Sequence, residues 1–339
     1  MATKWRAGCV ERGEMQRLNP WHGTCRLQFS ADADTTHHQG GCTAPFKLMR
    51  AERGNDGRCE LPLLHSAGGL VGGDQLSVDL ELGRNSRALI TSVAAQKVYG
   101  SIGRSRLHPK GTWANQSVSC RLGSNSDLEW LPQELVVYAD ALVEQSLDVQ
   151  LADDASFLSA EIVRLGRTAA GEDLRQGCWR SAVSLRRIGE NGTRWEQVDR
   201  LELSGDALHH RHGLNGDAVF GTLIWAAPAP LTNPTLKSLL TNARNDRAGL
   251  EGQMQCSGLE QGLIARYVGP SSRDARFWFS RIWARTRQLR KLSEPQIPRV
   301  WPLQESPLVE QRSESNLMKA DKQKSTISMR KGNEIKIDQ

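Results

Sequence analysis

The chain has 339 residues, of which 38% are apolar, and a formal net charge of +6. This length is enough to bury a large core without disulfide bonds. The sequence has no run of about 18 apolar residues, which excludes a membrane-spanning helix, and residues 1–20 lack the apolar segment of a secretory signal, so we expect a cytoplasmic protein.

Short stretches in which apolar and polar residues alternate predict β-strands along most of the chain. Residues 76–82, for example, place leucine or valine at every second position. Turn-forming residues separate these stretches, residues 31–45 have the composition of a loop, and Asn191-Gly192 predicts the turn of a hairpin. The predicted strands cover residues 21–29, 46–49, 59–64, 76–82, 88–93, 116–122, 127–138, 147–151, 185–203 (the hairpin), 220–226 and 263–268.

Three stretches have the spacing of helices. Asp154 is a candidate cap for a helix that would place Leu158, Ile162 and Leu165 on one face. Asn233-Pro234 is a typical helix start, and residues 272–290 predict a third helix.

Many short strands and few helices predict a mainly β protein, an elongated body of packed sheets with two or three helices. No β-α-β alternation is visible, which argues against a doubly wound sheet. We expect a ragged segment at residues 1–20, a β-rich domain at 21–304, and a disordered tail at 305–339, which is charged and has no aromatic residue.

A glycine-rich stretch lies between two predicted strands at residues 64–74. It contains Gly68, Gly69, Gly72 and Gly73 and ends at Asp74. The glycines precede a strand, and no Gly-Lys-Ser/Thr follows, so the stretch lacks the helix N-terminus that a phosphate loop needs. We interpret it as a tight turn at a strand mouth that can also carry a functional surface.

Polar residues in three later stretches allow a structural and a functional interpretation. In residues 91–101, Lys97 and Tyr99 lie on one face of a strand, and catalysis there is disfavoured because no cofactor site is apparent nearby. In residues 127–138, carboxylates lie among apolar residues; the simpler interpretation places them on a rim exposed to water, since buried carboxylates are costly unless paired. Arg167 and Glu172 either form an ion pair or place Glu172 on a channel.

Two clusters of basic residues also have two interpretations. Residues 273–291 carry seven arginines or lysines and one aspartate, which suits a solvated helix face or, alternatively, a docking face for an acidic partner. Residues 209–212 include three histidines, which suit a polar loop or a nickel or zinc site. The seven cysteines form no Cys-X-X-Cys pair and predict free, mostly buried thiols. They are Cys9, Cys25, Cys42, Cys59, Cys120, Cys178 and Cys256.

Taken together, five of these stretches resemble the urease accessory proteins of the UreD (also called UreH) family. The resemblance covers roughly residues 21–304. Two positions depart from the family pattern: Ser66-Ala67 replaces a proline that is common before the glycines, and Gly100 replaces a common arginine. The matching stretches are residues 68–74, residues 91–99, the Glu-Trp-Leu-Pro-Gln-Glu string at 129–134, Leu165-Gly166-Arg167 with Ala169, Gly171, Glu172 and Gly177, and Pro298-Arg299-Val300-Trp301.

The resemblance implies a maturation factor without catalytic activity of its own. Members of the family act with UreF-type and UreG-type proteins on apo-urease, and the assembly loads nickel and a carbamylated lysine into the urease active site at the expense of GTP, which the UreG-type protein hydrolyses. It further implies a β-rich scaffold that passes nickel through a polar tunnel and works in a hetero-oligomer. We expect no tightly bound cofactor, only transient Ni²⁺, and low solubility without a partner, since scaffolds expose apolar surface.

A transit path for nickel favours exchangeable oxygen ligands over clustered cysteine and histidine, which would hold the ion. On this basis the acidic residues in or beside the matching motifs are the candidate nickel-path residues: Asp74, Glu161 and Glu172. The candidate structural or partner-surface residues are Gly68, Gly69, Gly72, Gly73, Lys97, Tyr99, Glu129, Glu134, Arg167 and Gly171.

Two other functions remain open from the residues alone. A β-rich enzyme would use Lys97, Tyr99 and the acids near Glu129, but the sequence offers no recognisable nucleophile and base. A β-rich nucleic-acid binder would interleave aromatic and basic residues on its strands, whereas aromatic residues make up only 6% of the chain. We therefore expect protein partners, and neither nucleic acid nor a membrane.

Overall fold

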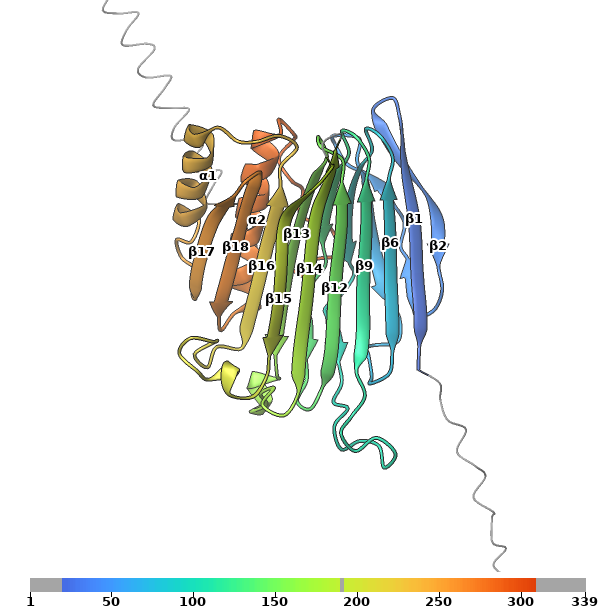
Figure 1. The fold of residues 1–339 in the computed structure, drawn as a ribbon, viewed down its shortest axis with the longest axis vertical. Helices are drawn as coiled ribbons and strands as arrows, with labels where there is room; N and C mark the ends of the chain where they lie inside the picture. Colours follow the sequence, from blue (N-terminus) through green and yellow to red (C-terminus); the bar gives the residue numbers. More distant parts are fainter. Residues whose placement is uncertain (1–19, 190–191, 309–339) are drawn as a thin grey trace, which may run out of the picture.

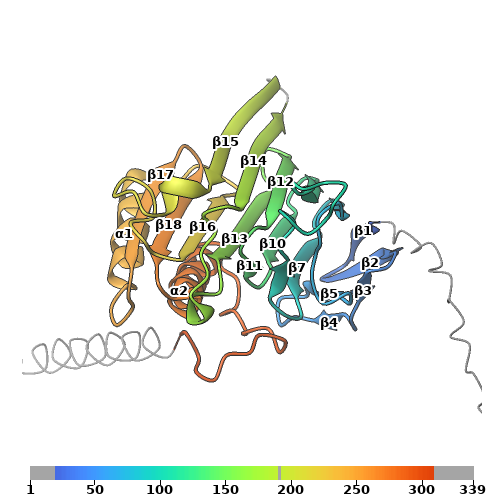
Figure 2. The ribbon, with the colours of Figure 1, turned by 90° about the horizontal axis from the view of Figure 1, so that it is seen from below.

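The structure is a computed structural model that describes residues 20–189 and 192–308. Two large β-sheets pack face to face, and two helices lie beside one of them (Figures 1 and 2). The first sheet has the strand order β15-β14-β12-β9-β6-β1-β2, and the second has the order β17-β18-β16-β13-β10-β7-β5-β3, with β4, β8 and β11 paired to its members.

The strands of the first sheet are β1 (His22–Asp32), β2 (Thr35–Cys42), β6 (Gln75–Leu82), β9 (Ala114–Leu122), β12 (Leu142–Leu151), β14 (Cys178–Gly189) and β15 (Gly192–Leu203). Those of the second are β3 (Phe46–Leu48), β4 (Glu52–Arg53), β5 (Cys59–His65), β7 (Arg87–Ser92), β8 (Gln96–Val98), β10 (Asp127–Leu131), β11 (Leu135–Val137), β13 (Ser156–Leu165), β16 (Val219–Ala226), β17 (Gln253–Leu259) and β18 (Gly262–Gly269). The helices are α1 (Asn233–Asn245) and α2 (Ser272–Leu289).

From β5 to β14 the chain winds between the sheets. Apart from the short strands β8 and β11, which follow β7 and β10 in the second sheet, sequential strands alternate between the two sheets, and neighbours within each sheet run parallel. Short corners at residues 83–86, 123–126 and 152–155 join the first sheet to the second. These corners stack on one another: the Asn125 side chain donates to that of Asn85 at 2.9 Å, and the Asn125 N–H donates to Asp154 at 2.8 Å. The connections at the opposite end are longer and irregular, which explains why the sequence has no repeat of fixed period.

The core follows from the alternation within the strands. The inward-facing residues of β6 are each 2% exposed and meet those of the opposite sheet. The middle of the second sheet, at β13 and β16, is buried on both faces because α2 covers its outer face (Figure 2), where Trp225 packs in one cluster with Trp278 and Trp283 of α2. A sheet covered on both faces needs apolar residues at successive positions, and all eight residues of β16 are buried.

The mainly β architecture with two helices confirms the predicted fold class, and both α1 and α2 begin where the sequence indicated. The hairpin also exists as β14 and β15, although its predicted turn lies partly outside the described residues. No described helix is long and apolar enough to cross a membrane. Among the described cysteines, all six are free thiols and all but Cys42 are buried; Cys9 lies outside the described residues.

The predicted helix at residues 154–165 is wrong, because these residues form the corner and strand β13. The spacing of Leu158, Ile162 and Leu165 suits a helix face, but β13 is covered on both sides, so Phe157 and Val163 are buried as well. A strand buried on both faces and a buried helix cannot be separated by periodicity.

Two further expectations need correction. Residues 31–45 are not all loop, since β2 pairs with β1 along eight residue pairs, and β17 was not expected. The single strand predicted at 127–138 divides at Pro132 into β10 and β11, because proline cannot donate to a strand ladder.

Of the predicted tail, residues 309–339 lie outside the described residues, whereas Leu308 is buried and the Pro307 carbonyl accepts a hydrogen bond from Arg281.

Candidate functional site

A cavity of about 390 Å³ lies between the two sheets. On one side its lining comes from β5, β7, β10, β13 and β16, and on the other from β6, β9, β12 and β14. Because neighbouring strands lie about 4.8 Å apart, a path from β5 to β16 crosses four strand spacings, or roughly 19 Å. The cavity is therefore elongated across the sheets.

The wall of this cavity includes polar side chains at inward-facing positions that would otherwise hold core residues. Glu161 of β13 faces Ser181 of β14, and the Ser181 hydroxyl lies 3.5 Å from the Glu161 carboxylate. On the opposite strands Gln145 donates to Gln116 at 3.2 Å and accepts from the Trp179 indole at 2.6 Å. The polar residues of the lining are His65, Thr91, Ser92, Gln96, Lys97, Gln116, Gln133, Gln145, Ser146, Ser159, Glu161, Ser181 and Thr222.

Glu161 is the one acidic residue of the described cavity lining. Burial raises the pKa of its carboxyl to about 7, and the negative charge of Asp199 acts in the same direction, whereas the Ser181 hydroxyl and Arg266 act against it. Near neutral pH, the carboxyl therefore exists in comparable protonated and ionised fractions. Such a group can exchange a proton for a cation without a large change in free energy.

An ion pair closes the space beside Glu161. Arg266 of β18 pairs with Asp199 of β15, which joins the second sheet to the first. The same guanidinium donates to the Thr222 hydroxyl at 2.9 Å, and Thr222 lies opposite Glu161 in the pairing of β13 with β16. The cavity carboxyl is thus next to a neutral pair, which leaves its own charge uncompensated.

His65 lines the same cavity from β5. Its Nε2 atom is buried and has no hydrogen-bond partner, and burial lowers the pKa of the imidazole, with Asp74 acting in the opposite direction. A neutral imidazole nitrogen that faces a cavity can donate or accept a hydrogen bond or act as an exchangeable ligand.

The raised pKa of Glu161 predicts a measurable pH dependence of stability. Between its ordinary value of 4.5 and about 7, the folded protein holds a proton that the unfolded chain releases, so this group's contribution falls as pH rises through that window. The loss is on the order of 3 kcal/mol at 1.4 kcal/mol per pH unit. Urea unfolding measures the free energy of unfolding of both proteins at pH 5 and at pH 8. We expect this free energy to fall less between pH 5 and pH 8 in Glu161→Gln than in the unmodified protein; equal changes in both proteins would contradict the raised pKa.

The cavity reaches the surface beside the glycine-rich stretch, where the lining residues Gly68, Ala94 and Lys97 are exposed. The stretch packs tightly here: a Cβ on Gly69 would lie 2.7 Å from the Tyr99 ring and 2.8 Å from the Lys97 carbonyl. Tyr99 in turn contacts Tyr138 edge-to-face at 5.2 Å between ring centroids. The glycines thus allow the turn and residues 97–99 to pack together.

Asp74 is buried at the end of this stretch, outside the cavity lining. One carboxylate oxygen accepts the Trp21 N–H at 2.8 Å, and the other accepts the Val71 N–H at 2.9 Å. This carboxylate therefore fixes two backbone segments. The arrangement gives Asp74 a positioning role, and its predicted place on a nickel path stays a prediction.

Glu172 forms an ion pair with Arg167 on the surface, and Arg167 also stacks over the Tyr138 ring at 4.6 Å. This is the ion-pair interpretation of the sequence, and Glu172 does not line the cavity. Gly171 ends the short turn between them with φ of +71°. Of the carboxylates of the 127–138 stretch, Glu134 is partly buried, with its carboxylate 3.9 Å from Arg276.

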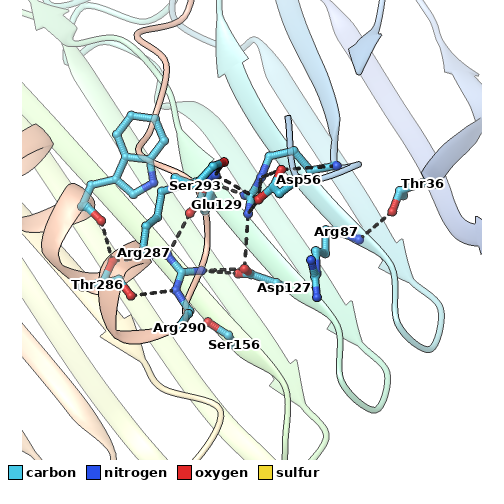
Figure 3. A network of polar contacts seen from close by, with 12 residues as sticks. Thr36, Asp56, Arg87, Asp127, Glu129, Ser156, Thr286, Arg287, Arg290 and Ser293 are labelled. Atoms are coloured by element: carbon cyan, nitrogen blue, oxygen red, sulfur yellow. Dashed lines mark hydrogen bonds and ion pairs between the residues drawn. The ribbon is translucent and has the colours of Figure 1, made fainter. Parts of the chain in front are cut away.

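The carboxylates of β10 are not on a rim exposed to water. Glu129 is fully buried and accepts from Arg58 at 2.5 Å, from Arg287 at 2.9 Å and from Arg290 at 2.8 Å. Figure 3 shows Arg287 and Arg290 directed from α2 toward the carboxylates of Asp127 and Glu129. The rim interpretation is wrong because the pairing partners come from elements distant in the sequence.

The same network corrects the interpretation of residues 273–291. They form no solvated helix face, since Arg276, Arg281 and Arg287 are each at most 5% exposed. Arg287 also bonds Asp56 at 2.9 Å, and Arg290 bonds Asp127 at 2.6 Å. The acidic surface on which this helix docks belongs to the chain itself.

The histidines at 209–212 form part of a turn-rich loop. His209 lies 3.2 Å from Asp173, and the rings of His210 and His212 are 5.2 Å apart. Among residues 20–189 and 192–308, no group of three or more His, Cys, Asp or Glu side chains could hold a metal ion.

A methyl group at Gly72 should disturb the stretch without touching the cavity. Its Cβ would lie 2.3 Å from the Ser101 hydroxyl and 2.6 Å from the Thr112 carbonyl, so backbone must move. We expect Gly72→Ala to lower the free energy of unfolding by about 1–3 kcal/mol, the usual effect of overpacking. Gly41→Ala is the control, because a Cβ there meets nothing within 4 Å; equal effects at both positions would contradict the close packing.

Sequence reasoning missed most of the cavity wall, including His65 and Ser181. The available signal was the placement of Ser159 and Glu161 at alternate positions of an apolar run. That pattern gains meaning only once residues 156–165 are recognised as a strand, because alternate residues then share one face.

Comparison with known proteins shows the family to which this chain belongs. The profile of a family described as UreD urease accessory protein matches residues 22–302. A protein named urease accessory protein UreD from Synechococcus sp. (strain CC9902) is 97% identical over 297 residues, which cover 88% of this chain and 96% of that protein. Proteins of the same name from Parasynechococcus marenigrum (strain WH8102) and Prochlorococcus marinus (strain NATL1A) are 68% and 52% identical, over 89% and 85% of this chain and 97% and 96% of their own lengths. The resemblance seen in the sequence is thus confirmed, and the chain belongs to the UreD family of urease accessory proteins.

Proposed function

We propose that this chain is a non-catalytic urease maturation factor that passes nickel through its inter-sheet cavity toward apo-urease. In this proposal it works in the cytoplasm within a hetero-oligomer and bridges apo-urease to UreF-type and UreG-type proteins. GTP is hydrolysed by the UreG-type protein. The family membership supports the accessory role, and the cavity that Glu161 lines is the observation on which the nickel path rests.

The chemistry of the cavity suits a cargo ion that must leave again. Closed sets of soft ligands hold divalent ions, whereas single carboxylate, hydroxyl and amide oxygens exchange readily. Glu161 has a pKa raised by burial to about 7, so nickel that binds it competes with a proton. This competition weakens binding at neutral pH, and the proton returns when the ion moves on.

The three predicted nickel-path residues take different places in the proposal. Glu161 is the ligand within the path. Asp74 supports the cavity mouth through its two backbone hydrogen bonds, and Glu172 lies outside the cavity lining in its surface pair with Arg167. Lys97 lies at the mouth itself and is exposed, so it would meet the partner that receives or supplies the ion.

The test is co-purification followed by activation. The tagged chain is co-expressed with apo-urease, the UreF-type protein and the UreG-type protein of the same organism, and the assembly is isolated and supplied with nickel, bicarbonate and GTP. We expect stable association and a rise in urease activity over an assembly that lacks this chain. A chain that retains none of the three partners, or an equal rise without it, would overturn the proposal.

A further inference from the structure

Residues 101–113, here called the basic loop, project from the end of the molecule at which the glycine-rich stretch lies (Figure 1, the teal loop below β9). The loop carries Arg104, Arg106, His108 and Lys110 and has no carboxylate. All four side chains belong to exposed residues. The loop therefore presents positive charge without a neighbouring carboxylate in its own sequence.

The basic loop is held in one shape by its own hydrogen bonds. At its base the Ser101 hydroxyl accepts the Thr112 N–H at 2.7 Å and donates to the Thr112 carbonyl at 2.9 Å. Further out, the Gly103 N–H donates to the Pro109 carbonyl at 2.9 Å. At the tip the Ser105 hydroxyl accepts the Leu107 N–H at 3.2 Å. The loop thus presents its charges in a preformed arrangement, which reduces the entropy lost on binding.

Apolar side chains are exposed at the loop tip and beside its base. Leu107 at the tip is 66% exposed, and Trp21, Val71 and Tyr99 are between 37% and 48% exposed. The Asp74 carboxylate holds the backbones of Trp21 and Val71 together, and a backbone hydrogen bond between Gly73 and Trp113 ties the stretch to the loop. Large exposed apolar residues gathered within a polar rim are typical of protein-binding surfaces.

We propose that the basic loop, with the adjacent Val71 and Tyr99, is a docking surface for a protein partner that presents an acidic patch around an apolar recess for Leu107. This inference rests on the proposed function, because the partner is a component of the urease-maturation assembly. The base of the loop packs against the glycine-rich stretch, where a Cβ on Gly72 would meet Ser101 and Thr112. The cavity opens beside the same stretch at Gly68 and Lys97, so a partner docked on the loop would lie next to that mouth.

The observations favour a protein over nucleic acid. Single-stranded nucleic acid is bound by exposed aromatic rings interleaved with basic residues. No Trp, Tyr or Phe lies among the basic residues at 104–110. Trp113 is partly buried and covered by the Arg180 guanidinium, 4.2 Å from its ring, and the exposed Trp21 and Tyr99 lie beside the loop base and not between its charges. Leu107 instead offers an aliphatic anchor, which suits a recess in a folded protein.

The experiment reverses the charges of the loop. Arg104→Glu, Arg106→Glu and Lys110→Glu are combined, and a matched control combines Lys47→Glu, Arg121→Glu and Lys237→Glu at exposed positions elsewhere. A third variant carries Leu107→Ser alone. Each is titrated against immobilised apo-urease, UreF-type protein and UreG-type protein from about 50 to about 300 mM salt, a range over which screening of exposed charges strengthens, and circular dichroism checks that the variants fold.

We expect the loop triple variant to bind one component at least about tenfold more weakly and with a shallower salt dependence, mainly through slower association. Leu107→Ser should weaken the same complex, and the control triple should stay within about twofold. Unchanged binding of the loop variants to every component that the unmodified chain binds would overturn the docking surface and leave the proposed function intact. Anionic vesicles and single-stranded RNA are titrated in the same way, and a loss of binding confined to them would overturn the docking surface too. If the unmodified chain binds no component, the proposed function fails instead.

Discussion

Replacing Glu129 by alanine should lower the free energy of unfolding by about 3–5 kcal/mol, because the change leaves buried guanidinium groups without their counter-charge. Glu129 is fully buried and contacts Arg58, Arg287 and Arg290. Removing it leaves three cations facing Asp56 and Asp127 alone. Arg58 is entirely excluded from solvent, so it cannot regain the lost interaction from water.

Denaturant unfolding of Glu129→Ala measures this effect, and Asp79→Ala supplies the matched control. Asp79 also pairs with an arginine, Arg26, but both side chains are at least 43% exposed, and exposed pairs contribute about 0–1 kcal/mol. Similar losses in the two variants would contradict the role assigned to the buried network.

The network also predicts how stability responds to acid. Burial alone would raise the pKa of Asp56, but the hydrogen bonds and charge of Arg58 lower it to about 2, and the three arginines likewise lower the pKa of Glu129. The folded protein therefore binds fewer protons than the unfolded chain between about pH 4 and pH 2, so this stabilisation is present above pH 4 and is lost as pH falls through that window. The acid unfolding of Glu129→Ala should begin at higher pH than that of the unmodified protein.

The helix at residues 272–289 could be predicted from the sequence, but its surroundings could not. Its arginines look like a solvated face because their partners Asp56, Asp127 and Glu129 lie more than 100 residues away in the chain. Charge patterning along one helix reports only its neighbours at three or four positions. Burial of a charged residue depends on its pairing with residues distant in the chain, and a single sequence does not show which residues pair.

A strand with one polar face is recognised by its period of two, whereas a strand buried on both faces can be mistaken for a helix. Period-two alternation identified β6, whose outward residues are polar. It failed for β13, which is buried on both faces between the first sheet and the helices. The same cause limited the prediction of the site, since the cavity wall around Glu161 follows only from recognising β13 and β14 as facing strands.

The predicted carboxylates illustrate how a motif can indicate a region without assigning roles inside it. Asp74, Glu161 and Glu172 all lie in or beside matching stretches. The fold separates them into a backbone-bridging group, a cavity group and a surface ion pair. Only hydrogen-bond partners and burial distinguish these roles, and neither can be read from residue type.

Replacing Glu161 by glutamine or alanine should lower the nickel content of co-expressed urease on the order of tenfold, the lower end of the effect of altered metal surroundings. This is the largest functional effect that we expect from one residue, and it rests on the proposed nickel path. Glutamine keeps the size and the hydrogen bond to Ser181 but removes the negative charge that attracts the ion. Nickel and urease are quantified by atomic absorption in the purified enzyme.

Glu172→Gln is the comparison for this variant, because Glu172 was also predicted on the path but lies outside the cavity lining. If the cavity carries the ion, Glu161→Gln lowers nickel loading while Glu172→Gln leaves it within about twofold, as expected for an exposed pair. Both variants must also retain the partner proteins in co-purification, because a variant that no longer assembles would lower nickel loading without any change in the path. Full nickel loading in both Glu161 variants, with assembly intact, would remove Glu161 from the path. A loss of loading in Glu172→Gln alone would place the path at the surface beside Arg167, because that change affects no atom of the cavity wall.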